Sequence, residues 1–307
     1  MECSFILREK TYVINLRIAA FNLKFDATES ELELNTPPSH TKFTQMNFHG
    51  LGYFDLPNSA LILKIKNRPL FDPEARFSPI YCAKNWELWQ DDDQNYMFTA
   101  PRIPSPQWII VNKAFSVGEV YSQYSNEKGK FIYPLFHDLE IVFFVNWLGS
   151  LGDIILHASG VILDGKGYAF IGSAGAGKST LAATLAKEGA VTNLGEDQVI
   201  LRMRDGQFWI YGTPWHLNPE MCSPQGVRLE KLFFLERNGK YATEPIKPTD
   251  GITRILQTAF VPYYRPALVS CIMDHLVLLA EEVPFRSLSY PLGSDVLKLI
   301  NGRSLYS

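Results

Sequence analysis

Hydrophobic and polar residues alternate in short runs along the first 136 residues of the chain. Alternation with period two is typical of half-buried strands, because successive side chains of a strand point to opposite faces of a sheet. The runs with strand patterns are Tyr12–Phe25, Ala60–Lys66, Trp86–Trp89, Tyr96–Phe98 and Trp108–Asn112. The sequence therefore predicts a β-rich N-terminal region over residues 1–137.

The second part of the chain begins with a helical pattern over Asp138–Leu148, which Gly149 ends. Two apolar strand patterns follow, Ile154–Leu163 and Tyr168–Ile171, and the segment Asp164-Gly165-Lys166-Gly167 separates them. Because Asp-Gly between two strands favours a tight hairpin turn, we expect these strands to be antiparallel neighbours.

The segment that follows these strands carries a phosphate-binding motif. Its residues, Gly172-Ser173-Ala174-Gly175-Ala176-Gly177-Lys178-Ser179-Thr180, fit G-x-x-x-x-G-K-[ST] between a strand pattern and a helix pattern. Glycines allow backbone N–H groups to approach phosphate oxygens, and the positive end of the following helix points at the same oxygens. Lys178 would reach the β- and γ-phosphates, and the Ser179 hydroxyl would bind Mg²⁺. The motif predicts binding of a nucleoside triphosphate, with ATP and Mg²⁺ as cofactors; ATP against GTP stays open, and the alternative is a Gly/Ala-rich turn before a helix.

The elements around this loop predict the class of fold. A helix is expected over Ser179–Glu188, and a second Asp-Gly hairpin joins Val199–Met203 to Phe208–Tyr211. Hairpins on both sides of the loop argue for a mixed or antiparallel sheet instead of the parallel sheet usual around such loops. The remaining expected elements are helices at Pro248–Phe260, His275–Leu279 and Asp295–Ile300 and a strand at Ser287–Tyr290. We predict an α/β fold of the α+β kind with a mixed sheet, in a domain over residues 138–307.

Glu196-Asp197 is the best candidate for the acidic pair that phosphoryl transfer requires. It ends the first strand pattern after the phosphate-loop helix, Val191–Leu194, which should bring it back towards the phosphates. Asp197 is also our candidate metal ligand, and the alternative for the pair is a solvated surface turn. His157 lies within an apolar strand pattern, where a histidine is either a core residue or the border of the site.

Two further segments leave alternatives open. Trp215-His216 would stack a nucleotide base or shape a substrate pocket, or would close a loop over the core. Arg254 would contact phosphate, or would be an exposed arginine on a helix face.

Composition and charge argue against several classes of function without excluding a local basic patch. The 307 residues are 46% hydrophobic and 20% charged, as in globular proteins, and a net charge of −3 gives no general attraction to nucleic acid or to anionic membranes. No signal peptide is evident, Leu139–Leu148 is too short to span a bilayer, and four widely spaced cysteines indicate reduced thiols. We expect a cytoplasmic protein without nucleic-acid or membrane partners.

The order and spacing of these motifs resemble a known family. His157-Ala158-Ser159-Gly160, the hairpin, Gly172–Thr180, Glu196-Asp197 and Thr213-Pro214-Trp215-His216 resemble the catalytic domain of bacterial HPr kinase/phosphorylase. They are more similar to its divergent relatives, which include the kinases of lasso-peptide gene clusters. The resemblance covers about Leu151 to Ile300, half of the chain.

The resemblance implies a phosphoenolpyruvate-carboxykinase-like fold and ATP- and Mg²⁺-dependent phosphorylation of a serine hydroxyl on a peptide or protein. It implies phosphate and Mg²⁺ binding by Lys178 and Ser179, base and metal contacts from Glu196 and Asp197, and a place beside the site for His157. The family has an aspartate pair where this chain has Glu196-Asp197, so which acid is the base stays open. Its arginine-containing signature is not evident, and Thr213-Pro214-Trp215-His216 occupies that region.

The leading hypothesis is therefore a kinase whose partners are a nucleoside triphosphate and a peptide or small-protein acceptor, with residues 1–137 as a region that recognises the acceptor or only completes the core. A role in peptide natural-product biosynthesis and a homo-oligomeric state are compatible with it. The alternatives are a non-catalytic nucleotide-binding regulatory or scaffold protein and a motor or switch NTPase, which has less support because no lone Asp ends a later apolar strand.

Overall fold

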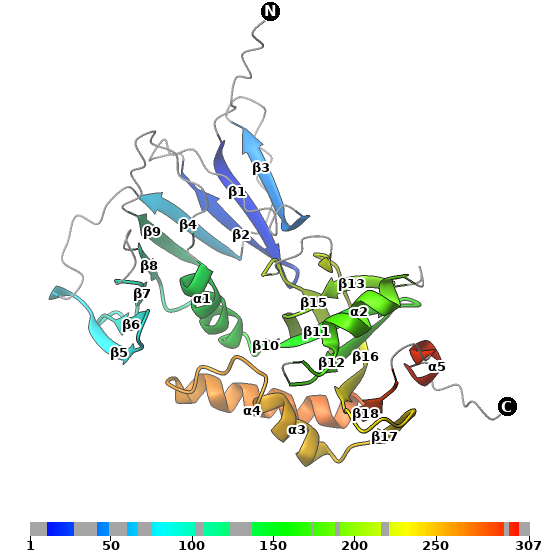
Figure 1. Cartoon of the computed structure of the whole chain (residues 1–307). Coiled ribbons are helices and arrows are strands. Elements are labelled where there is room, and N and C mark those ends of the chain that lie inside the picture. Colours follow the sequence, from blue (N-terminus) through cyan, green and yellow to red (C-terminus); the bar gives the residue numbers. More distant parts are fainter. Residues whose placement is uncertain are drawn as a thin grey trace, which may run out of the picture. The chain divides into compact units, whose positions relative to one another are not determined.

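A computed structural model describes residues 11–27, 42–48, 60–66, 75–101, 107–122, 135, 137–173, 175–187, 191–215, 221–291 and 295–300. It divides into two compact units, Met1–Phe143 and Phe144–Ser307, and each described part contains one large mixed sheet (Figure 1). The division lies inside α1 (His137–Gly149), while the predicted boundary precedes residue 138. No helix among the described residues has the length and apolar character needed to cross a membrane.

The N-terminal unit is the β-rich region that the alternating pattern predicts. Its sheet has the order β3-β1-β2-β4-β9-β8-β7-β6-β5 and is antiparallel except where β4 pairs with β2 and β9. The strands are β1 (Thr11–Ile18), β2 (Phe21–Asp26), β3 (Thr44–Phe48), β4 (Leu61–Lys66), β5 (Ser78–Cys82), β6 (Glu87–Gln90), β7 (Tyr96–Thr99), β8 (Gln107–Val111) and β9 (Val117–Ser122). In β4 and β8 every second side chain is buried, as the sequence pattern requires.

One predicted strand of this unit, Tyr12–Phe25, is wrong as a single element. The chain turns at Ala19 and Ala20, which have positive φ angles of 46° and 67°, and the two halves pair with each other as β1 and β2. Two alanines in this conformation carry no sequence signal for a turn, because glycine or asparagine is the usual residue there.

The C-terminal unit holds the second sheet, in the order β10-β14-β15-β16-β12-β11-β13, with β18 beside β16 and β17 beside β18. β16 is parallel to β12 and to β18, and the other pairs are antiparallel, so the predicted mixed sheet is confirmed. The strands are β10 (Ile154–Leu156), β11 (Ala158–Leu163), β12 (Lys166–Ile171), β13 (Val191–Gly195), β14 (Val199–Arg204), β15 (Gln207–Gly212), β16 (Gly226–Leu235), β17 (Ala242–Pro245) and β18 (Phe285–Ser289).

Both predicted Asp-Gly hairpins are present. Asp164 and Gly165 have φ angles of 51° and 73°, and Asp205 and Gly206 have 53° and 73°. Two consecutive positive φ angles are the signature of the type I′ turn, whose twist matches that of paired strands. The first turn joins β11 to β12 and the second joins β14 to β15, as expected.

The single strand predicted over Ile154–Leu163 is two strands in the structure. β10 pairs with β14, whereas β11 pairs with β12 and β13. His157 lies between them, and its backbone N–H donates to the carbonyl of Thr258 over 2.9 Å. The chain changes neighbours at His157, so the run Ile154–Leu163 does not continue as one ladder.

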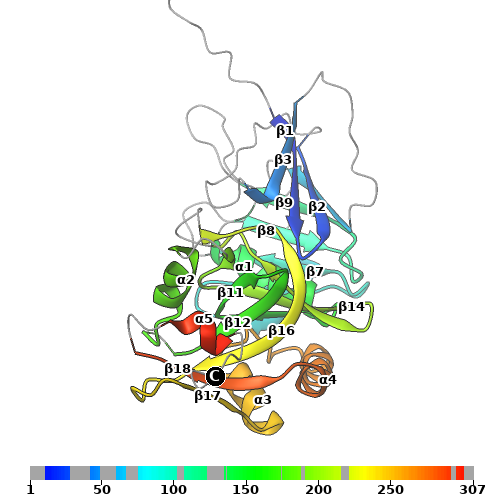
Figure 2. The same ribbon diagram turned by 90° about the vertical axis from the view of Figure 1, so that its right-hand side faces the viewer.

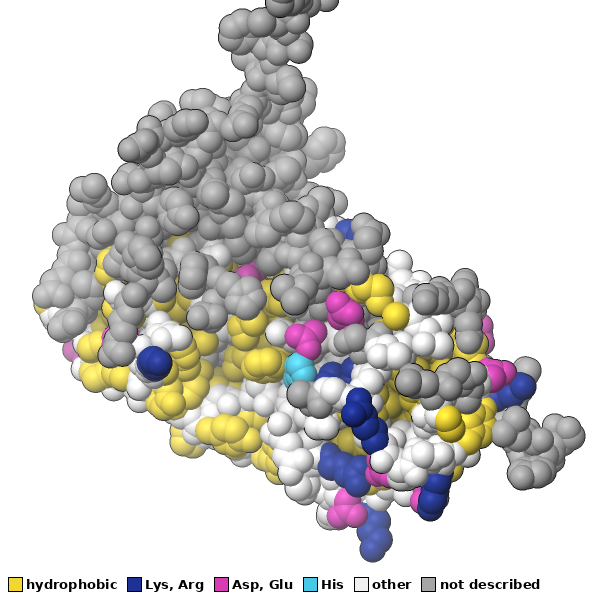
Figure 3. All heavy atoms as spheres, in the orientation of Figure 1, with side chains coloured by type: hydrophobic (Ala, Val, Ile, Leu, Met, Phe, Trp, Pro, Cys, Tyr) yellow, Lys and Arg dark blue, Asp and Glu magenta, His cyan; other side chains and the backbone are white. Residues whose placement is uncertain are grey.

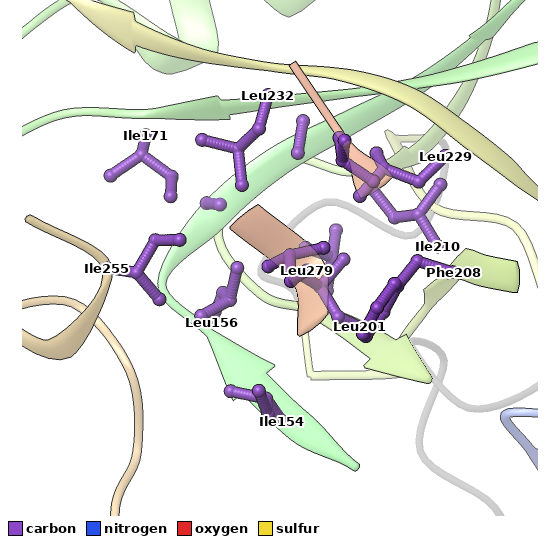
Figure 4. Packing of buried hydrophobic residues seen from close by; sticks show 14 of the residues in the cluster. Ile154, Leu156, Ile171, Leu201, Phe208, Ile210, Leu229, Leu232, Ile255 and Leu279 are labelled. Atoms are coloured by element: carbon purple, nitrogen blue, oxygen red, sulfur yellow. The ribbon is translucent and has the colours of Figure 1, made fainter. Parts of the chain in front are cut away.

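Helices cover both faces of this sheet, which gives three layers (Figure 2). α3 (Pro248–Leu256) and α4 (Pro266–Glu282) pack their buried residues on one face, where Ile255 and Leu279 meet strand residues such as Leu156 and Leu232 (Figure 4). α2 (Lys178–Lys187) and α5 (Val296–Ile300) cover the other face through Leu181, Leu185 and Val296. Burial of apolar side chains from both layers holds the helices against the sheet and stabilises the position of each strand end.

Candidate functional site

Four strands of the C-terminal sheet end at the same edge. β12 and β13 run in one direction because both are antiparallel to β11, and β16 and β18 are parallel to β12. Ligands of open α/β sheets bind outside the carboxyl ends of strands, and here these ends are followed by chemically active residues. The segments that follow the four strands are Gly172–Gly177, Glu196-Asp197, Glu236-Arg237 and Tyr290.

The loop after β12 has the backbone geometry that its sequence predicts. Gly175 and Gly177 have φ angles of 75° and 99°, which disfavour any residue with a Cβ. A Cβ on Gly172 would lie 2.7 Å from the Cβ of Ala176, so the start of the loop also requires glycine. The N–H groups of Gly175 and Gly177 donate to no described residue.

α2 begins directly after this loop, at Lys178, and has no acidic residue in its first turn. Its positive end is therefore available to an anion, and the loop and helix together fit phosphate oxygens. Ala174 and the side chain of Ser179 lie outside the described residues, and so does His216.

Lys178 is buried beneath the loop, with 6% of the residue exposed. Its Nζ donates to the carbonyl oxygens of Gly172 at 2.8 Å and Ser173 at 3.4 Å. Burial lowers the pKa of Lys178, and the nearby charge of Asp197 acts in the opposite direction. The Lys178 ammonium group would therefore contact phosphate oxygens that bind to the loop.

The acidic pair after β13 lies beside Lys178 and His157. Asp197 Oδ1 is 3.1 Å from His157 Nδ1, and the Asp197 side chain is 53% exposed. Glu196 is less exposed, and its pKa is raised by burial and then by the charge of Asp197. The structure therefore brings together three of the predicted catalytic residues, Asp197, His157 and Lys178, and Glu196 precedes Asp197 in the chain. A space-filling view shows an exposed histidine between acidic side chains and a group of Lys and Arg side chains (Figure 3).

The described residues contain no group of three or more His, Cys, Asp or Glu side chains that could hold a metal ion. Mg²⁺ in nucleotide sites is usually held by one or two carboxylates together with phosphate oxygens and water. The half-exposed Asp197 carboxylate beside the phosphate loop fits such a ligand.

The described segment after β15 packs into the core of the C-terminal unit. The Thr213 hydroxyl donates to the carbonyl of Gln198, and a Cβ on Gly212 would lie 2.0 Å from the Ser223 carbonyl oxygen. Trp215 is buried, and its ring centroid is 5.2 Å from that of Phe144. Of the two alternatives for this segment, the packing of Trp215 favours closure of the core over stacking on a base.

Sequence reasoning missed two residues at this edge, Arg237 and Tyr290. An Arg237 guanidinium nitrogen lies 3.9 Å from the position of a Cβ on Gly175, and the Tyr290 hydroxyl lies 3.9 Å from that on Gly177. Burial raises the pKa of Tyr290, so its hydroxyl stays neutral. Charged residues directly after the apolar run Leu232–Leu235 were the available signal for Arg237.

Arg254, a candidate phosphate contact, has a different partner. Its guanidinium donates to Glu236 over 3.1 Å and lies 5.5 Å from the centre of the Phe234 ring. The structure therefore favours the alternative, a half-exposed arginine on the face of α3, with Glu236 as its acid.

Comparisons with known proteins give a likeness at the level of solved structures. No family model matches the sequence, and no curated protein matches it. Among solved structures, the chain is similar to the Hpr(Ser) kinase/phosphatase from Coxiella burnetii, with 16% sequence identity and a TM-score of 0.27 over 48% of this chain and 86% of that one. The function of the chain is therefore inferred from the geometry of its own residues.

Proposed function

We propose that this chain is an ATP- and Mg²⁺-dependent kinase of the HPr-kinase-like type, which transfers the γ-phosphoryl group to a serine hydroxyl of a peptide or small protein. The observation that carries the proposal is one sheet edge at which a buried lysine under a glycine loop lies beside a carboxylate that is paired with a histidine. A phosphate-binding loop, a lysine and a nearby carboxylate are parts that phosphoryl-transfer sites share, because catalysis depends on positioning the phosphates and on compensating their charge.

The residues divide the task between binding and proton transfer. Residues Gly172–Thr180 would hold the triphosphate, with Lys178 on its β- and γ-phosphates and Ser179 and Asp197 as ligands of Mg²⁺. Bound Mg²⁺ would compensate charge on the phosphate oxygens. Glu196 would accept the proton of the serine hydroxyl, whose oxygen bonds to the γ-phosphorus while the bond from that phosphorus to the β–γ bridging oxygen breaks and ADP leaves.

Substitution at the phosphate loop and at the acidic pair tests this proposal. Lys178→Ala should abolish transfer, and Glu196→Gln or Asp197→Asn should lower the rate by about a hundredfold or more while changing nucleotide affinity far less. Lys166→Ala is the matched control, because Lys166 lies at the other end of β12 and pairs with Glu230. The measurement is phosphopeptide formation from ATP and Mg²⁺ by mass spectrometry, with ATP affinity by calorimetry.

Each result separates the alternatives. Full activity in both acid variants would contradict the assignment of catalysis to Glu196 and Asp197. ATP binding without any phosphorylated product would favour a regulatory or scaffold protein over a kinase.

The acceptor that we propose is a short peptide with a serine near its carboxyl end, as in peptide natural-product biosynthesis, and the N-terminal unit would contribute to its recognition. The probe is a short peptide with a serine near its carboxyl end, with a Ser→Ala peptide as its control. Phosphorylation of the Ser→Ala peptide at another residue type would contradict serine specificity.

A further inference from the structure

Arg237 is placed beside the phosphate loop by the pairing of β16 with β12. The parallel register sets Ile171 opposite Phe234, so Gly172 and Leu235 are neighbours where both strands end. The close approach of the two chains is direct, because a Cβ on Gly172 would lie 3.3 Å from the Cβ of Leu235. Two residues later, the Arg237 guanidinium reaches 3.9 Å from the Cβ position of Gly175.

The backbone that carries Arg237 is fixed to the neighbouring strand. The N–H of Glu236 donates to the carbonyl of Leu288 over 2.9 Å. On the other side of Arg237, the Asn238 side-chain oxygen accepts from the N–H of Lys240 and from the Ser289 hydroxyl. Contacts on both sides fix the backbone at Arg237, so little conformational freedom of this backbone is lost when a ligand binds.

The charge of Arg237 is not compensated by an ion pair with any described residue. Its nearest acid in sequence, Glu236, is held by Arg254 at 3.1 Å, and Arg237 itself forms no hydrogen bond or ion pair with a described residue. The side chain is exposed. A cation in this position, next to N–H groups that point to no described acceptor, suits an anion bound on the loop.

We infer that Arg237 is a second cationic contact to the phosphate chain of the nucleotide, supplied from the segment after β16 and additional to the buried Lys178. This inference rests on the proposed function only in taking a triphosphate as the ligand of the loop. A guanidinium keeps its charge at every physiological pH and can bind two phosphate oxygens at once. A lysine ammonium cannot form this bidentate contact.

The test compares Arg237→Met with the control Lys240→Met, which removes an exposed charge three residues away in the same loop. The probes are ATP and inorganic tripolyphosphate, both with Mg²⁺, measured by calorimetry with the full chain. Arg237→Met should weaken both probes by the same factor, about tenfold or more, because the lost contact is to phosphate alone. Arg237→Lys should recover part of the affinity, and Lys240→Met should bind as the unchanged protein does.

Three results overturn the inference. Unchanged affinity in Arg237→Met contradicts the Arg237 contact and leaves the proposed kinase intact. Loss confined to ATP, with tripolyphosphate unaffected, contradicts a contact to phosphate. If the unchanged chain binds neither probe, both the proposed function and this inference are wrong. Binding of the probes without phosphoryl transfer would contradict the proposed kinase activity and leave the Arg237 contact intact.

A loss of folding is detected separately, by the thermal unfolding midpoint of each variant. Where Arg237→Met does not fold, Arg237→Lys decides the question. A lysine variant with the affinity of the unchanged protein contradicts the need for a guanidinium, and a partial loss supports it.

Discussion

Glu196 and Asp197 are neighbours in the sequence but lie in different surroundings. Asp197 is half-exposed and is oriented by His157, which suits a carboxylate that binds a metal ion from the solvent side. Glu196 is less exposed, and burial together with the charge of Asp197 raises its pKa. A carboxylate with a raised pKa is the better proton acceptor, so we assign the base to Glu196 and the metal contact to Asp197.

The pH dependence of transfer tests this assignment. Glu196 must be ionised to accept a proton, so the rate should rise with pH through its raised pKa. Asp197→Asn removes a charge that raises this pKa, so in the protein without metal and nucleotide the pKa of Glu196, followed by NMR titration, should be lower in the variant. A pKa of Glu196 that is unchanged or higher in Asp197→Asn would contradict the coupling of the two carboxylates on which the assignment of the base rests.

The phosphate loop and the hairpin that feeds it contain glycines in similar conformations. Gly165 and Gly175 have φ angles of 73° and 75°, and no atom of the protein crowds a Cβ at either position within 3.4 Å. Alanine at either site should lower the free energy of unfolding by a similar amount, about 1–2 kcal/mol, because the left-handed conformation disfavours a Cβ. Only Gly175→Ala should also weaken ATP binding, since only that glycine lies where phosphate would bind.

Urea denaturation and ATP calorimetry on the two glycine variants give both quantities. If Gly165→Ala weakens ATP binding as much as Gly175→Ala does, the effect comes from lost stability of the β11–β12 hairpin. That result would contradict binding of phosphate to the backbone at Gly175.

The elements predicted well from the sequence are those with local signals. The two Asp-Gly turns fix the hairpins because their positive φ angles depend on adjacent residues only. The break at His157 could not be predicted, because it depends on a hydrogen bond to Thr258, about a hundred positions along the chain. β16 was missed for the same reason: its parallel partner β12 is distant in the sequence, and no turn marks that pairing.

At the scale of the whole molecule, the candidate site shows what a motif can and cannot specify. The phosphate loop, Lys178 and the acidic pair lie within 26 positions of one another and were predicted together. Arg237 and Tyr290 reach the same edge only because β16 and β18 lie parallel to β12 in the folded sheet. Their assignment therefore needed the topology, which no local pattern contains.

The stability of the fold should depend on another carboxylate, Asp153, which has no role in the proposed reaction. Asp153 precedes β10, is only 3% exposed, and has one side-chain oxygen without a hydrogen-bond partner among the described residues. Burial raises the pKa of Asp153 from an ordinary value of 3.8 to about 7, although Arg202 at 3.8 Å acts in the opposite direction. The folded chain thus binds this proton more tightly than the unfolded chain does.

Since the folded pKa lies above the unfolded one, ionisation of Asp153 destabilises the fold, and stability should fall as pH rises from about 4 to about 7. The full difference corresponds to about 4 kcal/mol at most. Asp153→Asn removes the penalty, so at pH 8 the amides of β10 and β14 should exchange more slowly in the variant than in the unchanged chain, while the two proteins should agree near pH 4. Hydrogen exchange of the full chain measures this at each pH, with β7 and β8 of the N-terminal unit as internal controls. Faster exchange of β10 and β14 in Asp153→Asn at pH 8 would show instead that an ionised Asp153 stabilises the sheet through Arg202.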